Sequence, residues 1–161
     1  MESKSKILKK EIDELIKGVE EIELRFKLLA ENPEGYLNKF FPDVSTSDLT
    51  TIMDVFAGEP LFFTNRAGEC THLINNCTQA LHILPDETPD ECRIRRSQFV
   101  FIASKLTQLI SNFSDLQSQI EEALDGDPIA LGIITNSIPD VLDNFDFIKT
   151  ECDKIKKVFI F

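Results

Sequence analysis

The residues from Arg93 to Leu124 carry the most regular apolar pattern in the chain. Apolar side chains recur there at alternating steps of three and four, which places them on one face of an α-helix. Asp125-Gly126-Asp127-Pro128 ends the stretch. A helix of this length with one polar face needs partner helices to be stable, so the stretch is expected to be the central helix of a bundle. The repeating residues are Phe99, Ile102, Leu106, Leu109, Phe113, Leu116, Ile120 and Ala123.

Two earlier stretches repeat the pattern and predict the partner helices. Residues 6–30 are expected to form a first long helix, which Asn32-Pro33 ends. Residues 61–84 are expected to form a second, followed by an acidic turn from Pro85 to Pro89. Their apolar positions are Leu8, Ile12, Leu15, Val19, Ile22, Phe26 and Leu29 in the first, and Phe63, Ala67, Cys70, Ile74, Cys77, Leu81 and Leu84 in the second.

The segment between these two helices is less regular. Ser45 to Ser47 can cap a short helix over residues 48–57, which Gly58 ends. An aromatic cluster precedes it, and we expect this cluster to pack over one end of the bundle. Its members are Tyr36, Phe40 and Phe41.

The chain after the central helix predicts a linker and a fourth helix. Residues 125–137 are rich in small apolar side chains and are interpreted as the linker. Residues 138–161 are expected to be helical, with Pro139 in the first turn, where its missing N–H costs nothing. The pattern still runs at Phe161, which suggests a truncated chain or one lacking a longer domain. The apolar face of this helix is Val141, Phe145, Ile148, Cys152, Ile155 and Phe159.

Composition limits the function classes. A chain of 161 residues with 42% hydrophobic residues suits one domain with a real core, and the helical apolar patterns predict that this domain is all-α. The net charge of -11 repels phosphate backbones, so nucleic acid is not an expected partner. The four cysteines suit reduced core thiols in a cytoplasmic protein. No apolar run reaches membrane-spanning length, and no catalytic, cofactor or metal-binding motif occurs. We therefore expect neither an enzyme nor a cofactor.

Short motifs within the helices resemble the syntaxin family. The stretch Arg93-Ile94-Arg95-Arg96-Ser97-Gln98, followed by Leu106 through Leu124, resembles the start of the syntaxin Hc helix. The first helix is similar to Ha, and the stretch Thr64-Asn65-Arg66-Ala67 is similar to Hb. The resemblance implies that residues 1–124 form an Habc domain, an antiparallel up-down three-helix bundle, with the fourth helix packed on it.

The resemblance continues beyond this domain. Residues 121–134 resemble the segment between Hc and the SNARE helix, so residues 138–161 would be the opening of a SNARE motif. The central glutamine of that motif and the membrane anchor would lie beyond Phe161. The Leu-Glu latch of the family would fall near Ile120 and Glu121. With an anchor, the full-length protein would sit on the cytosolic face of a membrane.

The implied function is conformational gating in vesicle trafficking and membrane fusion. The SNARE helix of the family folds into a groove between Hb and Hc, where it cannot pair with other SNARE proteins, and a regulator of the SM class (the Sec/Munc type) binds this closed form. The docking face would be the apolar face of the fourth helix. The groove would be lined by Leu73, Ala80, Phe101, Ile110 and Leu124.

Two other readings stay open. The four apolar faces can build a helical bundle that does not switch. The chain can also be a stand-alone adaptor or scaffold of the cytoskeletal or signalling kind, with the aromatic cluster Tyr36–Phe41 as its contact surface. A bundle that binds a small ligand is a third class, but the expected core offers it no convergent polar groups.

Overall fold

The structure is a computed structural model that describes residues 3–43 and 52–159. All regular secondary structure in these residues is helical, which confirms the predicted all-α class. The helices are α1 (Lys4–Glu31), α2 (Pro33–Phe40), α3 (Ile52–Gly58), α4 (Phe62–Gln79), α5 (Pro89–Leu124) and α6 (Pro128–Phe159).

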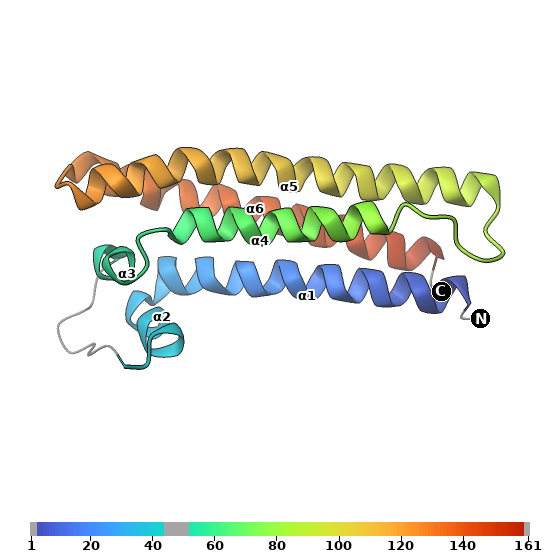
Figure 1. The fold of residues 1–161 in the computed structure, drawn as a ribbon, viewed down its shortest axis with the longest axis horizontal. Helices are drawn as coiled ribbons and strands as arrows, with labels where there is room; N and C mark the ends of the chain where they lie inside the picture. The colour runs from blue at the N-terminus through green and yellow to red at the C-terminus, as the bar shows by residue number, and fades with distance from the viewer. Residues whose placement is uncertain (1–2, 44–51, 160–161) are drawn as a thin grey trace.

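Four long helices, α1, α4, α5 and α6, lie side by side, and each runs antiparallel to the long helix before it (Figure 1). Helix α4 packs on α5, α5 on α6, α6 on α1, and α1 on α4. The long helices therefore form a ring around a shared core. The short helices α2 and α3 lie at one end of the ring, and the two termini lie at the other (Figure 1).

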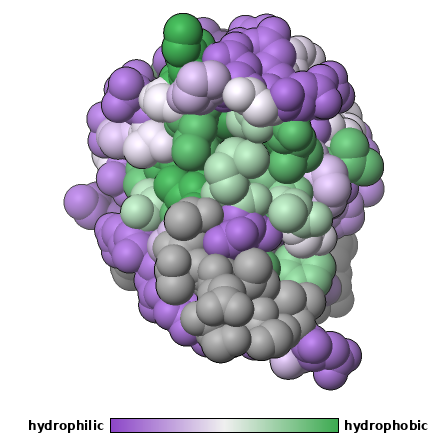
Figure 2. Space-filling view, turned by 90° about the vertical axis from the view of Figure 1, so that its left-hand side faces the viewer, coloured by the Kyte–Doolittle hydropathy of each residue, from purple (hydrophilic) through white to green (hydrophobic). Residues whose placement is uncertain are grey.

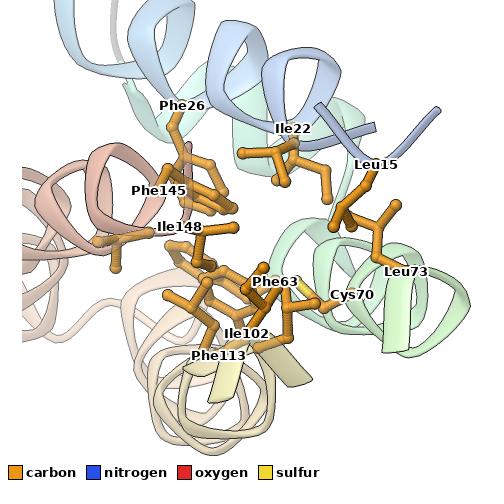
Figure 3. Packing of buried hydrophobic residues seen from close by; sticks show 14 of the residues in the cluster. Leu15, Ile22, Phe26, Phe63, Cys70, Leu73, Ile102, Phe113, Phe145 and Ile148 are labelled. Atoms are coloured by element: carbon orange, nitrogen blue, oxygen red, sulfur yellow. The ribbon is translucent and has the colours of Figure 1, made fainter. Parts of the chain in front are cut away.

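The core is built from the apolar faces that the sequence pattern identifies. Phe26 of α1 lies at its centre, with its ring centroid 5.4 Å from that of Phe113, 5.6 Å from that of Phe62 and 5.8 Å from that of Phe145. Figure 3 shows Phe26, Phe63, Phe113 and Phe145, one from each long helix, pointing inward. Because every helix contributes to one cluster, none of them is an appendage.

The structure corrects the expected linker over residues 125–137. Only a short turn separates α5 from α6, and Asp127 Oδ1 accepts a hydrogen bond of 2.9 Å from the Ile129 N–H. Helix α6 then runs through Pro139. Ala130, Ile134 and Ile138 are buried and continue the apolar face back from Val141. Burial of these side chains in the core outweighs the roughly 3 kcal/mol that an interior proline costs a helix.

Helix α5 begins at Pro89, four residues before the expected start. Thr88 is its N-cap, and the Thr88 Oγ1 accepts a hydrogen bond of 3.2 Å from the Glu91 N–H. A threonine followed three residues later by glutamate is a capping-box sequence. The N-terminal end of α5 could therefore have been predicted from the sequence. Helix α4 ends at Gln79 rather than at residue 84, because arginines from α5 bind the carbonyl groups that follow.

Helix α2 was not expected. Asn32 ends α1 and also caps α2, because its Oδ1 accepts a hydrogen bond of 2.9 Å from the Gly35 N–H. Pro33 then occupies the first position of the new helix. In the region of the expected helix 48–57, the structure has α3 from Ile52 to Gly58, and residues 44–51 lie outside the described part of the chain.

Candidate interaction surfaces

The expected docking face of the last helix packs into the core. Val141, Phe145, Ile148, Cys152 and Ile155 are buried, and Phe159 is partly buried against the same cluster. In Figure 3, Phe145 and Ile148 point toward Phe26 and Ile102. Two ion pairs bind α6 to α1: Lys149 Nζ lies 2.7 Å from Glu23 Oε2, and Lys156 Nζ lies 3.2 Å from Asp13 Oδ1.

The groove expected for this helix is not where α6 lies. Helix α6 packs between α1 and α5 rather than between α4 and α5. Leu73 faces α1, since a Cβ at Gly18 would lie 2.3 Å from Leu73 Cδ2. Phe101 faces α6, with its ring centroid 5.6 Å from that of Phe147. Ala80 is buried, Leu124 is exposed and Ile110 is half-buried, so the five expected groove residues do not form one surface. The heptad pattern gave their spacing but not their neighbours.

Helix α6 therefore leaves the outer surface between α4 and α5 uncovered, and the described residues along the middle of this surface are uncharged. On α5, Val100, Thr107 and Ser114 repeat every seven residues and share one helix face. Ser114 lines a surface cavity with Ile110 and with Thr64 and Ala67 of α4. The α4 wall continues, at helical spacing, through Thr71, Ile74 and Thr78.

Charged residues lie at the two ends of this surface. At the α5 N-terminal end, Arg93 and Arg96 line a cavity of about 630 Å³ between α5 and the segment that follows α4, together with Glu87 and the apolar side chains of Ile83 and Val100. At the other end, Glu121 lines the second cavity. Within the described residues, the ion pairs between long helices lie elsewhere and join α1 to α4, to α5 and to α6. We call the surface from Arg93 to Glu121 the α4–α5 groove.

The two expected latch residues have different environments. Ile120 is fully buried in the core, whereas Glu121 is exposed beside the α4–α5 groove. Neighbouring residues of a helix point to different sides, so the pair does not act as one contact.

The arginine run that carries the strongest resemblance has a structural role in this chain. Arg95 is fully buried, and its Nε donates a hydrogen bond of 2.7 Å to Glu87 Oε1. Its Nη1 and Nη2 donate to the carbonyl oxygens of Ala80 and His82. The adjacent Arg96 donates from Nε to the Leu81 oxygen at 2.5 Å. Together these arginines satisfy the carbonyl groups that follow α4.

The aromatic cluster packs over one end of the bundle, as expected. Tyr36 is 1% exposed, and its ring centroid lies 4.7 Å from that of Phe40. Its hydroxyl donates a hydrogen bond to the Glu59 carboxylate and accepts one of 3.4 Å from Arg66. Burial, together with the neighbouring Glu59, raises the Tyr36 pKa. Tyr36 is therefore too deeply buried to take part in the contact surface of the adaptor hypothesis, whereas Phe40 and Phe41 are partly buried.

Gln117 was not singled out from the sequence, although it joins two helices. Its Nε2 donates a hydrogen bond of 2.8 Å to the Pro60 oxygen, and its Oε1 accepts one of 3.1 Å from the Thr64 N–H. It thereby satisfies a backbone donor at the start of α4, where the N-cap Leu61 makes no side-chain bond. In the sequence, only the position of this glutamine beside the apolar repeat could have indicated its role.

The cysteines are mostly core residues. Cys70, Cys77 and Cys152 are buried, while Cys92 is half-buried beside the groove end. Burial raises the pKa of each of the three buried thiols from 9.0 to about 12, which keeps them protonated and unreactive.

Apolar side chains also gather at the end of the bundle that carries α2 and α3 (Figure 2). Those exposed near this end are Leu61, Leu124 and Ile129. No helix within the described ranges is long and apolar enough to span a membrane. Those ranges also contain no group of three or more His, Cys, Asp or Glu side chains placed to hold a metal ion.

Comparison with known proteins gives no match. The chain matches no protein-family model, no curated protein and no solved structure.

Proposed function

We propose that the chain is a regulatory helical bundle of the syntaxin-like kind, which acts in vesicle trafficking by receiving an amphipathic helix in its α4–α5 groove. The observation that carries this proposal is the groove itself, uncharged along its middle and left open by the packing of α6. In this view residues 1–124 correspond to an Habc domain, and an SM-class regulator and other SNARE proteins are the partners that the resemblance implies.

The energetics favour reception of a partner helix over release of α6. Six large buried side chains of α6 each contribute about 1.5–3 kcal/mol through burial, and these are Ile134, Ile138, Val141, Phe145, Ile148 and Ile155. Their summed contribution, on the order of 10–20 kcal/mol, is as large as the whole stability of a typical domain. Releasing α6 would therefore unfold the bundle, whereas filling the α4–α5 groove leaves the core intact.

The groove has the chemistry that suits a helix face. Its walls combine half-buried apolar residues such as Ile74 and Ile110 with the short side chains of Thr71, Thr107 and Ser114. Short side chains let a third helix approach closely, and apolar contacts then supply the binding energy. The absence of charge from the middle of the described groove avoids the cost of desolvating ions.

A matched pair of substitutions tests the proposal. Thr107 and Thr135 are both exposed, and the Oγ1 of each donates a hydrogen bond of 2.9 Å to the carbonyl oxygen four residues earlier. Thr107→Arg places a long cation in the groove, while Thr135→Arg makes the same change on α6. Titration calorimetry with a purified SM-class regulator and with a purified SNARE helix should show at least tenfold weaker binding for Thr107→Arg alone.

Two results would overturn the proposal. One is that neither purified protein binds the unaltered chain. The other is that Thr107→Arg and Thr135→Arg bind as tightly as the unaltered chain, which would move the contact away from the groove. Circular dichroism of both variants checks that the bundle stays folded.

A further inference from the structure

The first half of α5 has an unusual charge for this chain. The protein has 28 Asp and Glu residues against 17 Lys and Arg. Yet the stretch from Cys92 to Ser114 contains no acidic residue, while Arg93, Arg95, Arg96 and Lys105 lie within it. Arg95 is buried and paired with Glu87. The cations left on the surface near the α4–α5 groove are therefore Arg93 and Arg96.

These two arginines border an apolar cavity at the groove end. Ile83 is 71% exposed and Val100 is 55% exposed there, so a ligand that covers them gains hydrophobic energy. Arg96 uses its Nε on the Leu81 oxygen, and no described residue accepts a bond from its terminal amino groups. Arg93 Nη2 lies 3.7 Å from Asp90 Oδ1, and both side chains are largely exposed, so this pair is weak.

We propose that the helix received by the α4–α5 groove is acidic at one end, where a carboxylate beside a large apolar side chain meets Arg93 and Arg96. The opposite end of that helix carries a cation against Glu121. This inference rests on the proposed function and adds the chemistry of the partner and its direction in the groove. Guanidinium groups bind carboxylates in paired hydrogen bonds, and complementary charges at two points fix the direction.

Charge complementarity favours a helix over a membrane or a second copy. Arg93 and Glu121 are 28 positions apart, which is about 42 Å along a helix. An anionic membrane would attract the arginine end and repel the Glu121 end, whereas one helix can match both. A second copy of the chain brings a net charge of -11 to a surface of the same net charge, which opposes self-association.

Selection from a peptide library tests the proposal. Yeast display of 32-residue helical peptides, which are long enough to span this distance, should, after selection against the full chain, enrich Asp or Glu next to Leu or Phe at one end and Lys or Arg at the other. Arg93→Glu should lower the affinity of the enriched peptides for the chain about tenfold. A second selection against this variant should enrich peptides with a basic end in place of the acidic one. Lys105→Glu is the control, because it changes the net charge by the same amount at a position away from the groove. The Lys105 side chain lies over the rings of Phe101 and Phe147.

Each of the other possible results contradicts either the inferred charge of the partner helix or the proposed function as well. Enriched peptides that lose binding in Thr107→Arg but show no acidic end would overturn this inference and leave the proposed function standing. Peptides insensitive to Thr107→Arg, or no enrichment, would overturn both. Binding of phosphatidylserine vesicles that Arg93→Glu abolishes would assign the arginines to a membrane. Self-association in sedimentation velocity that Arg93→Glu abolishes would assign them to a second copy.

Discussion

Arg95 shows how one buried ion can organise a helix junction. Its guanidinium binds the Glu87 carboxylate and two carbonyl groups that follow α4. Burial alone would raise the pKa of Glu87, but the hydrogen bonds from Arg95 and from the Leu84 N–H outweigh it and lower the pKa. These bonds tie the segment between α4 and α5 to the start of α5.

Arg95→Ala should destabilise the protein by about 3–5 kcal/mol, because it leaves a buried carboxylate and two carbonyl groups without a partner. Urea denaturation followed by circular dichroism measures the free energy of unfolding. Arg93→Ala serves as the control and should change it by less than about 0.5 kcal/mol, since that side chain is exposed. Equal effects of the two substitutions would contradict this role for Arg95.

The buried carboxylate of Glu23 makes the stability of the folded protein depend on pH. Burial would raise its pKa, but the hydrogen bonds from Lys149 and Lys27 outweigh burial, so the folded pKa lies below its ordinary value of 4.5. The stabilisation from Glu23 is therefore complete above pH 4.5 and is lost as the pH falls through the folded pKa.

Glu23→Gln should reduce stability by about 1.5–3 kcal/mol at pH 7, and the difference from the unaltered chain should shrink in acid. Urea denaturation at several pH values between 7 and 3 measures this difference. Glu20→Gln, at an exposed position of the same helix, should have little effect at any pH. A difference for Glu23→Gln that stays constant down to pH 3 would exclude the ionised pair as its cause.

At the scale of the element, α6 is one helix despite its internal proline. The residues on either side of Pro139 continue the same buried face, from Ala130 through Ile138 to Val141 and Phe145. The proline removes one backbone donor and crowds the preceding turn. The helix therefore persists because its neighbours α1 and α5 hold it, not because its own sequence favours it at this point.

Pro139→Ala should stabilise the protein by about 1–3 kcal/mol, because alanine restores the backbone donor within the helix. The increase would appear as a higher midpoint in urea. Pro128→Ala, at the first position of α6, should be neutral or slightly destabilising, since proline suits that position. A loss of stability from Pro139→Ala would mean that the proline begins a helix after a linker.

On the scale of the whole molecule, the ring of four long helices is expected to unfold as one unit. Phe26 of α1 contacts Phe113 of α5 and Phe145 of α6 within one buried cluster. A helix that contributes to a shared core cannot leave without exposing the apolar faces of its neighbours.

The double substitution Phe145→Asp and Ile148→Asp should therefore unfold the entire bundle. Hydrogen exchange followed by mass spectrometry should show loss of protection in α1, α4 and α5 together with α6, because both side chains are fully buried. In the unaltered chain, α6 should exchange as slowly as α5. Fast exchange confined to residues after Val141 would instead indicate a detachable helix.

Most helices were predictable because each apolar repeat reports on a single segment. The buried faces of α1, α5 and α6 match the expected positions from Leu8 to Ile155. The starts of α2 and α5 were missed, although Asn32-Pro33 and the Thr88–Glu91 capping box mark them. The prediction of a linker over residues 125–137 was wrong. Pro139 and the small apolar residues before it show no clear helical pattern unless their burial is known. Membership of the syntaxin family stays a prediction.

The sequence by itself determined which face of each helix is apolar, because a repeat of three and four residues fixes that face within one segment. Only the tertiary structure decided that α6 packs between α1 and α5, leaving the α4–α5 groove open. Helices whose apolar faces have similar widths can be arranged around a bundle in several different orders. The order realised depends on contacts between distant residues, such as Lys149 with Glu23 and Phe145 with Phe26, which no local pattern encodes.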